Sequence, residues 1–139
     1  MNYEKVEQLM TTSLFTVHED ELVDIVAFMM ERKQIRHVLV EDDDHSLVGL
    51  VSYRSVLRLM AEGFDSAVSE TPPVGDIMER HPTCVGPETL TLDAMQLMRQ
   101  ERVSCLPVVN EGKLVGIVSE TDFMPLAYEL LQERLGKEG

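Results

Sequence analysis

The sequence contains no tryptophan, only two cysteines and few positively charged side chains. Twelve lysines and arginines stand against 25 aspartates and glutamates, which gives a formal net charge of −13. Proteins bind nucleic-acid backbones through clustered Lys and Arg, so we do not expect DNA or RNA binding as the main activity. We interpret the excess charge as an acidic, solvated surface that favours solubility.

No uninterrupted apolar run approaches the roughly 18 residues that a membrane-spanning helix needs. Residues 1–10 are polar and lack the apolar core of a secretory signal. Cys84 and Cys105 belong to no CxxC or Cys/His pattern, so we expect two buried free thiols and no zinc site. The acidic run at 41–45 lacks the ligand spacing of an EF-hand and is expected to be a solvated loop. We therefore expect a cytoplasmic protein with no membrane anchor and no bound metal.

The sequence does contain an internal repeat. Met10 aligns with Met78, and the alignment continues at this 68-residue shift into the middle of each copy. Gly49 aligns with Gly116 at a shift of 67, because the hairpin loop of the first copy has one extra residue. The order and type of residues agree over about 55 positions, which indicates two copies of one supersecondary unit.

Each copy shows the same order of predicted elements. A short helix and a brief strand come first, followed by an amphipathic helix at 21–33 or 89–101. Two β-rich runs separated by a short polar loop then predict an antiparallel hairpin. A final helix at 53–62 or 120–135 closes the copy.

The apolar spacing of the first long helix predicts which of its faces is buried. Leu22, Ile25, Val26 and Met29 recur at intervals of three and four residues, so we expect them to pack on the core. We also expect the methionines of both long helices, among them Met95, to fill gaps in the core.

We place the first repeat at 3–64, a linker at 65–73 and the second repeat at 74–135. A unit of this size buries only about 60% of its unfolded surface and is marginally stable alone. We therefore predict an α+β fold in which two β-α-β-β-α repeats pack sheet against sheet with pseudo-two-fold symmetry. Clefts between such repeats are the usual place for small ligands.

Two stretches identify a known family. The second copy contains "LPVVNEGKLVGIVSETDF", and the first contains the looser match "HVLVEDDDHSLVGLVSYRSV". With these stretches the chain resembles, over nearly its whole length, a tandem pair of cystathionine-β-synthase (CBS) domains, called a Bateman module. The resemblance implies a regulatory module that binds AMP, ADP, ATP or S-adenosylmethionine between its repeats. It also implies a homodimer, a regulated protein partner and no further required cofactor.

The segment "GIVSETD" at 116–122 matches the ribose-and-phosphate motif of that family. The resemblance implies that Asp122 binds the ribose hydroxyls and that Ser119 and Thr121 lie near a phosphate. A carboxylate offers two acceptor oxygens to a cis-diol, and free N–H groups at a helix start favour an anion. Ser119 and Asp122 also have the spacing of a capping box, which would only stabilise the helix start. The two interpretations are compatible, and both stay open.

The first copy departs from this motif. It carries Arg54 and Ser55 where the second copy has Thr121 and Asp122. A serine cannot offer two anionic oxygens to a ribose, so we predict one competent nucleotide site and one degenerate site. Arg54 fills the second cleft itself, reaches a phosphate or faces solvent, and the three alternatives stay open.

The resemblance also implies ligand contacts from the first repeat. Ile35, Arg36 and His37 enter its hairpin, and Thr16 closes the segment before its first strand. In the family these positions hold the adenine and the phosphates, and Arg36 would supply a permanent positive charge. A surface ion pair for Arg36 and a packed role for His37 are the alternatives.

We find no catalytic constellation, no Walker loop and no GxGxxG segment, so we do not expect an enzyme. A different class of function is a dimerisation or scaffold module without a ligand. Apolar residues of the closing helices favour it, among them Leu57, Met60, Leu126 and Leu131.

Overall fold

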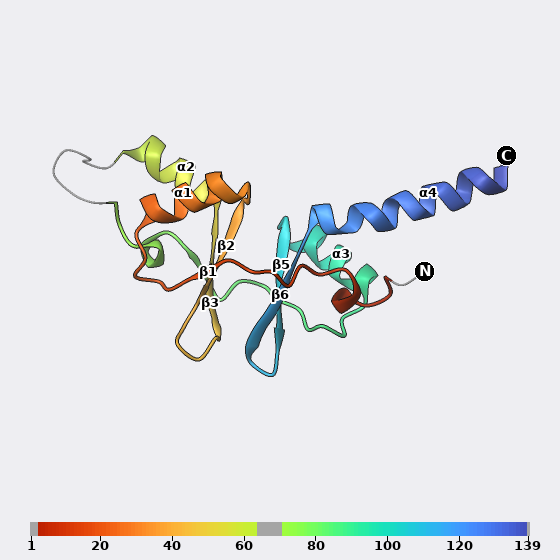
Figure 1. Cartoon of the computed structure of the whole chain (residues 1–139), viewed down its shortest axis with the longest axis horizontal. Helices are drawn as coiled ribbons and strands as arrows, with labels where there is room; N and C mark the ends of the chain where they lie inside the picture. The colour runs from red at the N-terminus through yellow and green to blue at the C-terminus, as the bar shows by residue number, and fades with distance from the viewer. Residues whose placement is uncertain (1–2, 64–70, 139) are drawn as a thin grey trace. The chain divides into compact units, whose positions relative to one another are not determined.

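The computed structural model describes residues 3–63 and 71–138 and has the predicted α+β composition. The chain divides into two compact units (Figure 1). Unit 1 consists of Met1–Ser13, Cys84–Asn110 and Val115–Gly139. Unit 2 consists of Leu14–Thr83 and Glu111–Leu114.

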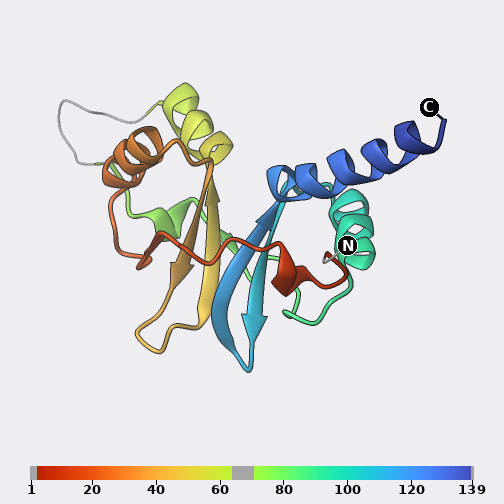
Figure 2. The ribbon, with the colours of Figure 1, turned by 45° about the vertical axis from the view of Figure 1, so that its right-hand side comes forward.

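Unit 2 is built on a four-stranded sheet in the order β1-β2-β3-β4. Strand β1 runs parallel to β2, and the other neighbours are antiparallel. Helices α1 and α2 lie side by side in both views (Figures 1 and 2). The elements of this unit are β1 (Thr16–Val17), α1 (Val23–Lys33), β2 (His37–Glu41), β3 (Leu47–Ser52), α2 (Tyr53–Glu62), the 3-10 helix η2 (Val74–Asp76) and β4 (Glu79–Arg80).

Unit 1 repeats this arrangement with shorter pairings. The hairpin β5–β6 is flanked by two isolated bridges, a parallel one between Val85 and Val108 and an antiparallel one between Thr11 and Ile117. The bridges correspond to the β1–β2 and β3–β4 pairings of unit 2. The elements are η1 (Val6–Gln8), α3 (Thr91–Glu101), β5 (Cys105–Asn110), β6 (Lys113–Ser119), η3 (Glu120–Phe123) and α4 (Met124–Glu138).

The two units exchange the segments that open the sequence repeats. Residues 3–13, here called the leading segment, lie next to β6 of the second repeat (Figure 1). Residues 74–83, which open the second repeat, lie next to β3 of the first. The compact units and the sequence repeats therefore divide the chain at different places. Of the predicted linker at 65–73, only the last three residues fall within the described ranges.

Each exchanged segment contributes side chains to the core of its unit. Val6 is fully buried in unit 1, and Val74 and Met78 are buried in unit 2. Full burial of an aliphatic side chain contributes about 1.5–3 kcal/mol, so these contacts hold the exchanged segments in place. The core of unit 1 comprises Val6, Val85, Ala94, Met98, Leu106, Val108, Val118 and Phe123. The core of unit 2 comprises Val17, Val23, Val26, Met30, Val38, Val40, Val51, Val56, Val74 and Met78.

The aligned glycines explain how the exchanged segments come so close to the hairpins. A Cβ atom at Gly116 would lie 2.7 Å from Met10 Sδ and 3.1 Å from the Thr11 carbonyl oxygen. A Cβ atom at Gly49 would lie 2.9 Å from Met78 Cγ. Only glycine leaves room for a methionine at both places, which accounts for the repeated Gly and Met of the two copies.

The buried face of α1 differs from the predicted one. Val23, Val26 and Met30 are buried, whereas Ile25 is 46% exposed. Val26 and Met30 are thus buried as expected, whereas Ile25 was wrongly expected in the core, because several apolar residues of the helix fit more than one phase. Met95 of α3 is 39% exposed and so was wrongly expected in the core.

Two further side chains lie in surroundings that the sequence did not indicate. Cys84 is exposed and only Cys105 is buried, so the expectation of two buried thiols was wrong for Cys84. Leu126 is buried because it lies on the inner face of α4, although it was expected to be exposed.

Within the described ranges, no helix combines the length and the hydrophobicity needed to cross a membrane.

Candidate ligand-binding site

Strand β6 of unit 1 ends at Ser119, and η3 turns the chain back so that Asp122 lies beside it. Asp122 Oδ2 accepts hydrogen bonds from the Ser119 backbone N–H at 2.8 Å and from Ser119 Oγ at 3.2 Å. The two residues form the reciprocal capping box that the sequence allowed. The capping interpretation is therefore confirmed for this state of the protein, and it keeps the carboxylate in a fixed place.

The leading segment supplies a third donor to the same carboxylate. Thr11 Oγ1 donates to Asp122 Oδ1 at 3.1 Å. The backbone of Thr11 pairs with Ile117 through two hydrogen bonds of 2.9 Å, which fixes the threonine opposite the end of β6. No local sequence pattern indicated Thr11, because it lies 111 residues from Asp122 and belongs to the other repeat.

Hydroxyl groups surround the carboxylate. Ser119 Oγ lies 2.9 Å from Thr121 Oγ1, and both Thr11 and Thr121 are exposed to solvent. The Glu120 N–H donates to the Ser104 carbonyl at 3.2 Å, which ties the start of η3 to the start of β5. The structure thus brings Ser119, Thr121 and Asp122 together and places a half-buried carboxylate among hydroxyls.

The equivalent place in unit 2 has the same backbone but different chemistry. Ser52 caps α2, its Oγ accepting from the Ser55 N–H at 3.2 Å. Glu79 pairs with Leu50 at the position that Thr11 holds in unit 1. In unit 2 the carboxylate is therefore that of Glu79 on β4, and the hydroxyls lie at the start of α2. Unit 1 has the reverse arrangement, with the hydroxyl of Thr11 on the leading segment and the carboxylate of Asp122 in η3.

Thr16 and His37, two of the predicted ligand residues, lie in unit 2. Thr16 Oγ1 donates to Glu41 Oε1 at 2.9 Å, so the β1 hydroxyl already has an acceptor on β2. His37 begins β2 and pairs with Ser52 across the hairpin. The structure describes these residues in a different unit from Asp122.

Ile35 and Arg36 line an open hollow of about 350 Å³ between α1 and α2 of unit 2. The Arg36 guanidinium lies 5.4 Å from the centroid of the Tyr53 ring. The backbone carbonyl of Arg36 accepts a hydrogen bond from the Tyr53 backbone N–H. A hydrogen bond and the charge of Arg54, with a further contribution from Arg36, lower the pKa of the Tyr53 phenol. Two arginines thus lie beside one tyrosine, and Glu31 also lines the hollow.

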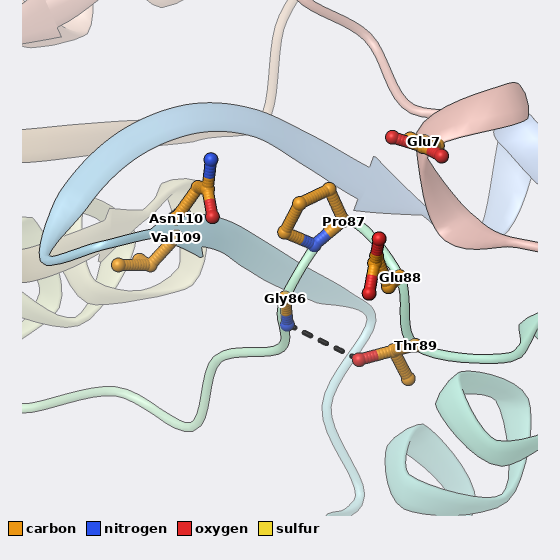
Figure 3. Close-up of a pocket in the computed structure, with 7 residues that line it drawn as sticks. All are labelled: Glu7, Gly86, Pro87, Glu88, Thr89, Val109 and Asn110. Carbon is orange, nitrogen blue, oxygen red and sulfur yellow. Dashed lines mark hydrogen bonds between the residues drawn. The ribbon is translucent and has the colours of Figure 1, made fainter.

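The other large hollow, about 400 Å³ in unit 1, has a different lining (Figure 3). It is lined by Glu7, Gly86, Pro87, Glu88, Thr89, Val109 and Asn110. Its two carboxylates make it unfavourable for an anionic nucleotide, and Asp122 is not among its lining residues. Among residues 3–63 and 71–138, no three His, Cys, Asp or Glu side chains converge as metal ligands would.

Two segments of the chain, residues 6–62 and 74–128, each match the model of the CBS domain. This chain belongs to the CBS domain family. The two matches agree with the internal repeat, and the α+β architecture predicted for a CBS pair is confirmed.

Several known CBS proteins resemble this CBS pair along most of their length. A CBS domain-containing protein of Dictyostelium discoideum is 29% identical over 136 residues, which cover 91% of this chain and 93% of that protein. A crystal structure of a Vibrio cholerae protein named for acetoin utilization, AcuB, is 31% identical with a TM-score of 0.82, covering 95% of this chain and 97% of that one. The crystal structure of CBSX2 in complex with AMP is 28% identical with a TM-score of 0.78, covering 91% and 98%.

Other relatives are much longer than this CBS pair. An inosine-5′-monophosphate dehydrogenase of Methanocaldococcus jannaschii is 27% identical over 121 residues, but these residues make up only 23% of that enzyme. The similarity to it therefore concerns a part of the enzyme and assigns no catalytic activity to this chain.

Proposed function

We propose that this CBS pair is a regulatory module that binds an adenosyl nucleotide through Asp122 of unit 1. The observation that carries the proposal is the half-buried Asp122 carboxylate at the end of β6, held by Thr11 and Ser119. A ribose presents two neighbouring hydroxyl donors, and an ionised carboxylate is the acceptor that matches them. The AMP complex of CBSX2, at 28% identity, supports an adenosyl ligand.

The charges of unit 1 favour a ligand with few phosphates. Ser104 and Cys105 hold the positions that correspond to Arg36 and His37 of the other repeat. At these two positions unit 1 therefore offers no permanent positive charge to a phosphate. We expect AMP and S-adenosylmethionine to bind more tightly than ATP, whose polyphosphate is repelled by an acidic protein.

Titration calorimetry tests the proposal with the whole chain. Asp122→Asn keeps the shape of the side chain and one acceptor oxygen but removes the charge. Hydrogen bonds to a charged group contribute about 1.5–3 kcal/mol, so this change should weaken AMP binding by about tenfold or more. Asp93→Asn on α3 removes an exposed carboxylate of the same unit and should leave binding unchanged.

Two outcomes would contradict the proposal. Absence of binding by AMP, ADP, ATP and S-adenosylmethionine to the wild-type protein at millimolar concentration would rule out the sensor function. Equal AMP affinity in wild type and Asp122→Asn would mean that the nucleotide binds elsewhere.

A bound ligand acts on a protein partner only if it binds two states of the module with different affinities. The regulatory part of the proposal is therefore tested by measuring partner binding with and without AMP.

Exposed apolar side chains favour a second candidate, self-association. Leu57 and Met60 of α2 are both 58% exposed, and Leu131 of α4 is 60% exposed. Burying such side chains against a second copy would remove them from water. Sedimentation velocity should show a dimer that Leu57→Glu weakens, whereas a concentration-independent monomer would contradict this candidate.

A further inference from the structure

The hydrogen bonds of Asp122 limit how a ribose can bind there. An ionised carboxylate has about four acceptor sites, two on each oxygen. Oδ2 accepts from the backbone N–H and from Oγ of Ser119, and Oδ1 accepts from Thr11. Counting donors among residues 3–63 and 71–138, one acceptor site remains, on Oδ1, whereas a cis-diol that donates twice needs two. One of the three present donors therefore has to leave when a ribose binds.

The Ser119 hydroxyl is the donor that can leave at the least cost. It lies 3.2 Å from Asp122 Oδ2 and only 2.9 Å from Thr121 Oγ1, so it keeps a partner after it turns away. The Ser119 N–H cannot leave without opening the capping box. Once the hydroxyl has turned, each carboxylate oxygen of Asp122 has one free acceptor site, which matches the two hydroxyls of a ribose.

Thr11 differs from Ser119, because within the described ranges its Oγ1 has Asp122 as a hydrogen-bond partner and no second hydroxyl to turn to, and its backbone is fixed. It pairs with Ile117 in both directions at 2.9 Å, and Met10 before it packs against Gly116. Its Oγ1 therefore stays within reach of Asp122 Oδ1 and restrains rotation of the carboxylate. A carboxylate held in one orientation loses less conformational freedom on binding than a free one.

We infer that Thr11 is a positioning residue, which orients Asp122 for the ribose diol and so favours ribose over deoxyribose. The inference rests on the proposed function and adds to it a specificity element from the other sequence repeat. The nucleotide site of unit 1 is incomplete without the leading segment. Unit 2 has Glu79 at the corresponding place and so lacks such a hydroxyl.

The test compares AMP with 2′-deoxy-AMP in four proteins. Thr11→Val removes the hydroxyl and keeps the branched shape, Thr11→Ser restores a hydroxyl, and Asp93→Asn changes an exposed side chain of α3 in the same unit. Thr11→Val should weaken AMP binding about tenfold, the equivalent of about 1.4 kcal/mol, by titration calorimetry. The same change should weaken 2′-deoxy-AMP by only about twofold, because that ligand has no diol to align. Thr11→Ser and Asp93→Asn should resemble the wild type with both nucleotides.

The results separate this inference from the function beneath it. If Asp122→Asn abolishes AMP binding but Thr11→Val binds both nucleotides like the wild type, Thr11 has no positioning role and the inference is overturned. An equal loss for AMP and 2′-deoxy-AMP in Thr11→Val would overturn it too, because Thr11 would then only support the fold. Absence of AMP binding to the wild type would overturn the proposed function and this inference together.

Discussion

The close contact between Gly116 and the leading segment makes a sharp prediction for Gly116→Ala. The new methyl group would lie 2.7 Å from Met10 Sδ and 3.1 Å from the Thr11 carbonyl oxygen. The sulfur ends a flexible side chain and can move aside. The carbonyl belongs to the β-bridge with Ile117, so it can yield only if the leading segment shifts.

The size of the effect follows from two opposing contributions. Overpacking a tight contact typically costs about 1–3 kcal/mol. Replacing a glycine also restricts the unfolded chain, which stabilises the protein by about 0.4–1 kcal/mol. We therefore expect Gly116→Ala to lower the free energy of unfolding by about 1 kcal/mol, or the Tm by about 4 °C for a chain of this length.

Urea denaturation of a double-mutant cycle isolates the contact. Met10→Ala removes the sulfur, so Gly116→Ala should cost less in that background, with a coupling energy of about 1 kcal/mol. Met78→Ala, the equivalent change in unit 2, should show no coupling to Gly116→Ala. Gly86→Ala is the matched control, because its methyl group would meet nothing closer than the Val109 carbonyl at 3.8 Å.

One result would refute the reasoning about the exchanged segments. If Gly116→Ala couples to Met78→Ala and not to Met10→Ala, the leading segment does not pack on the hairpin of the second repeat. A Gly116→Ala protein as stable as Gly86→Ala would likewise contradict the close approach.

Three further predictions concern the buried anchor, the degenerate site and the acidic loop. Val6→Ala removes a fully buried side chain and should destabilise the protein by about 2 kcal/mol in urea denaturation, and no loss would contradict its anchoring role. Ser55→Asp combined with Glu79→Thr gives unit 2 a carboxylate at the helix start and a hydroxyl on β4, as in unit 1. Calorimetry should then show a second AMP site. An unchanged AMP stoichiometry would show that these two positions do not decide why one unit binds the nucleotide and the other does not. The backbone N–H of Ser46, helped by that of Asp44, lowers the pKa of Asp42, so the carboxylate should titrate below 3.8 by NMR. The stability that the ionised Asp42 carboxylate gives the loop is then present above pH 3.8 and is lost as the pH falls through the lowered pKa. A titration midpoint above 3.8 would contradict these hydrogen bonds.

Local sequence patterns predicted the elements of the fold well. The hairpins followed from β-rich runs around a short polar loop, and α1 and α3 begin within two residues of the predicted starts at 21 and 89. The capping box of Ser119 and Asp122 was also predictable, because it depends on residues three positions apart. Such features are encoded by neighbouring residues, so one sequence is enough to find them.

The exchange of leading segments was not predictable in the same way. Whether residues 3–13 pack on the first or the second hairpin depends on contacts between distant parts of the chain, and both hairpins carry the glycine that such packing needs. The hydrogen bond from Thr11 to Asp122 depends on that choice, so no local motif could indicate it. The phase of the α1 stripe was misjudged for a related reason, since Ile25 and Val26 are both apolar and only tertiary packing decides which is buried.

The most direct test of the central claim is a crystal structure of the protein with bound AMP, in which the distances from Asp122 to the ribose are measured. We predict that the 2′- and 3′-hydroxyl oxygens lie about 2.5–3.0 Å from the two carboxylate oxygens, with Ser119 Oγ turned toward Thr121. A nucleotide whose ribose lies away from Asp122, while the carboxylate keeps all three of its present hydrogen bonds, would contradict the account.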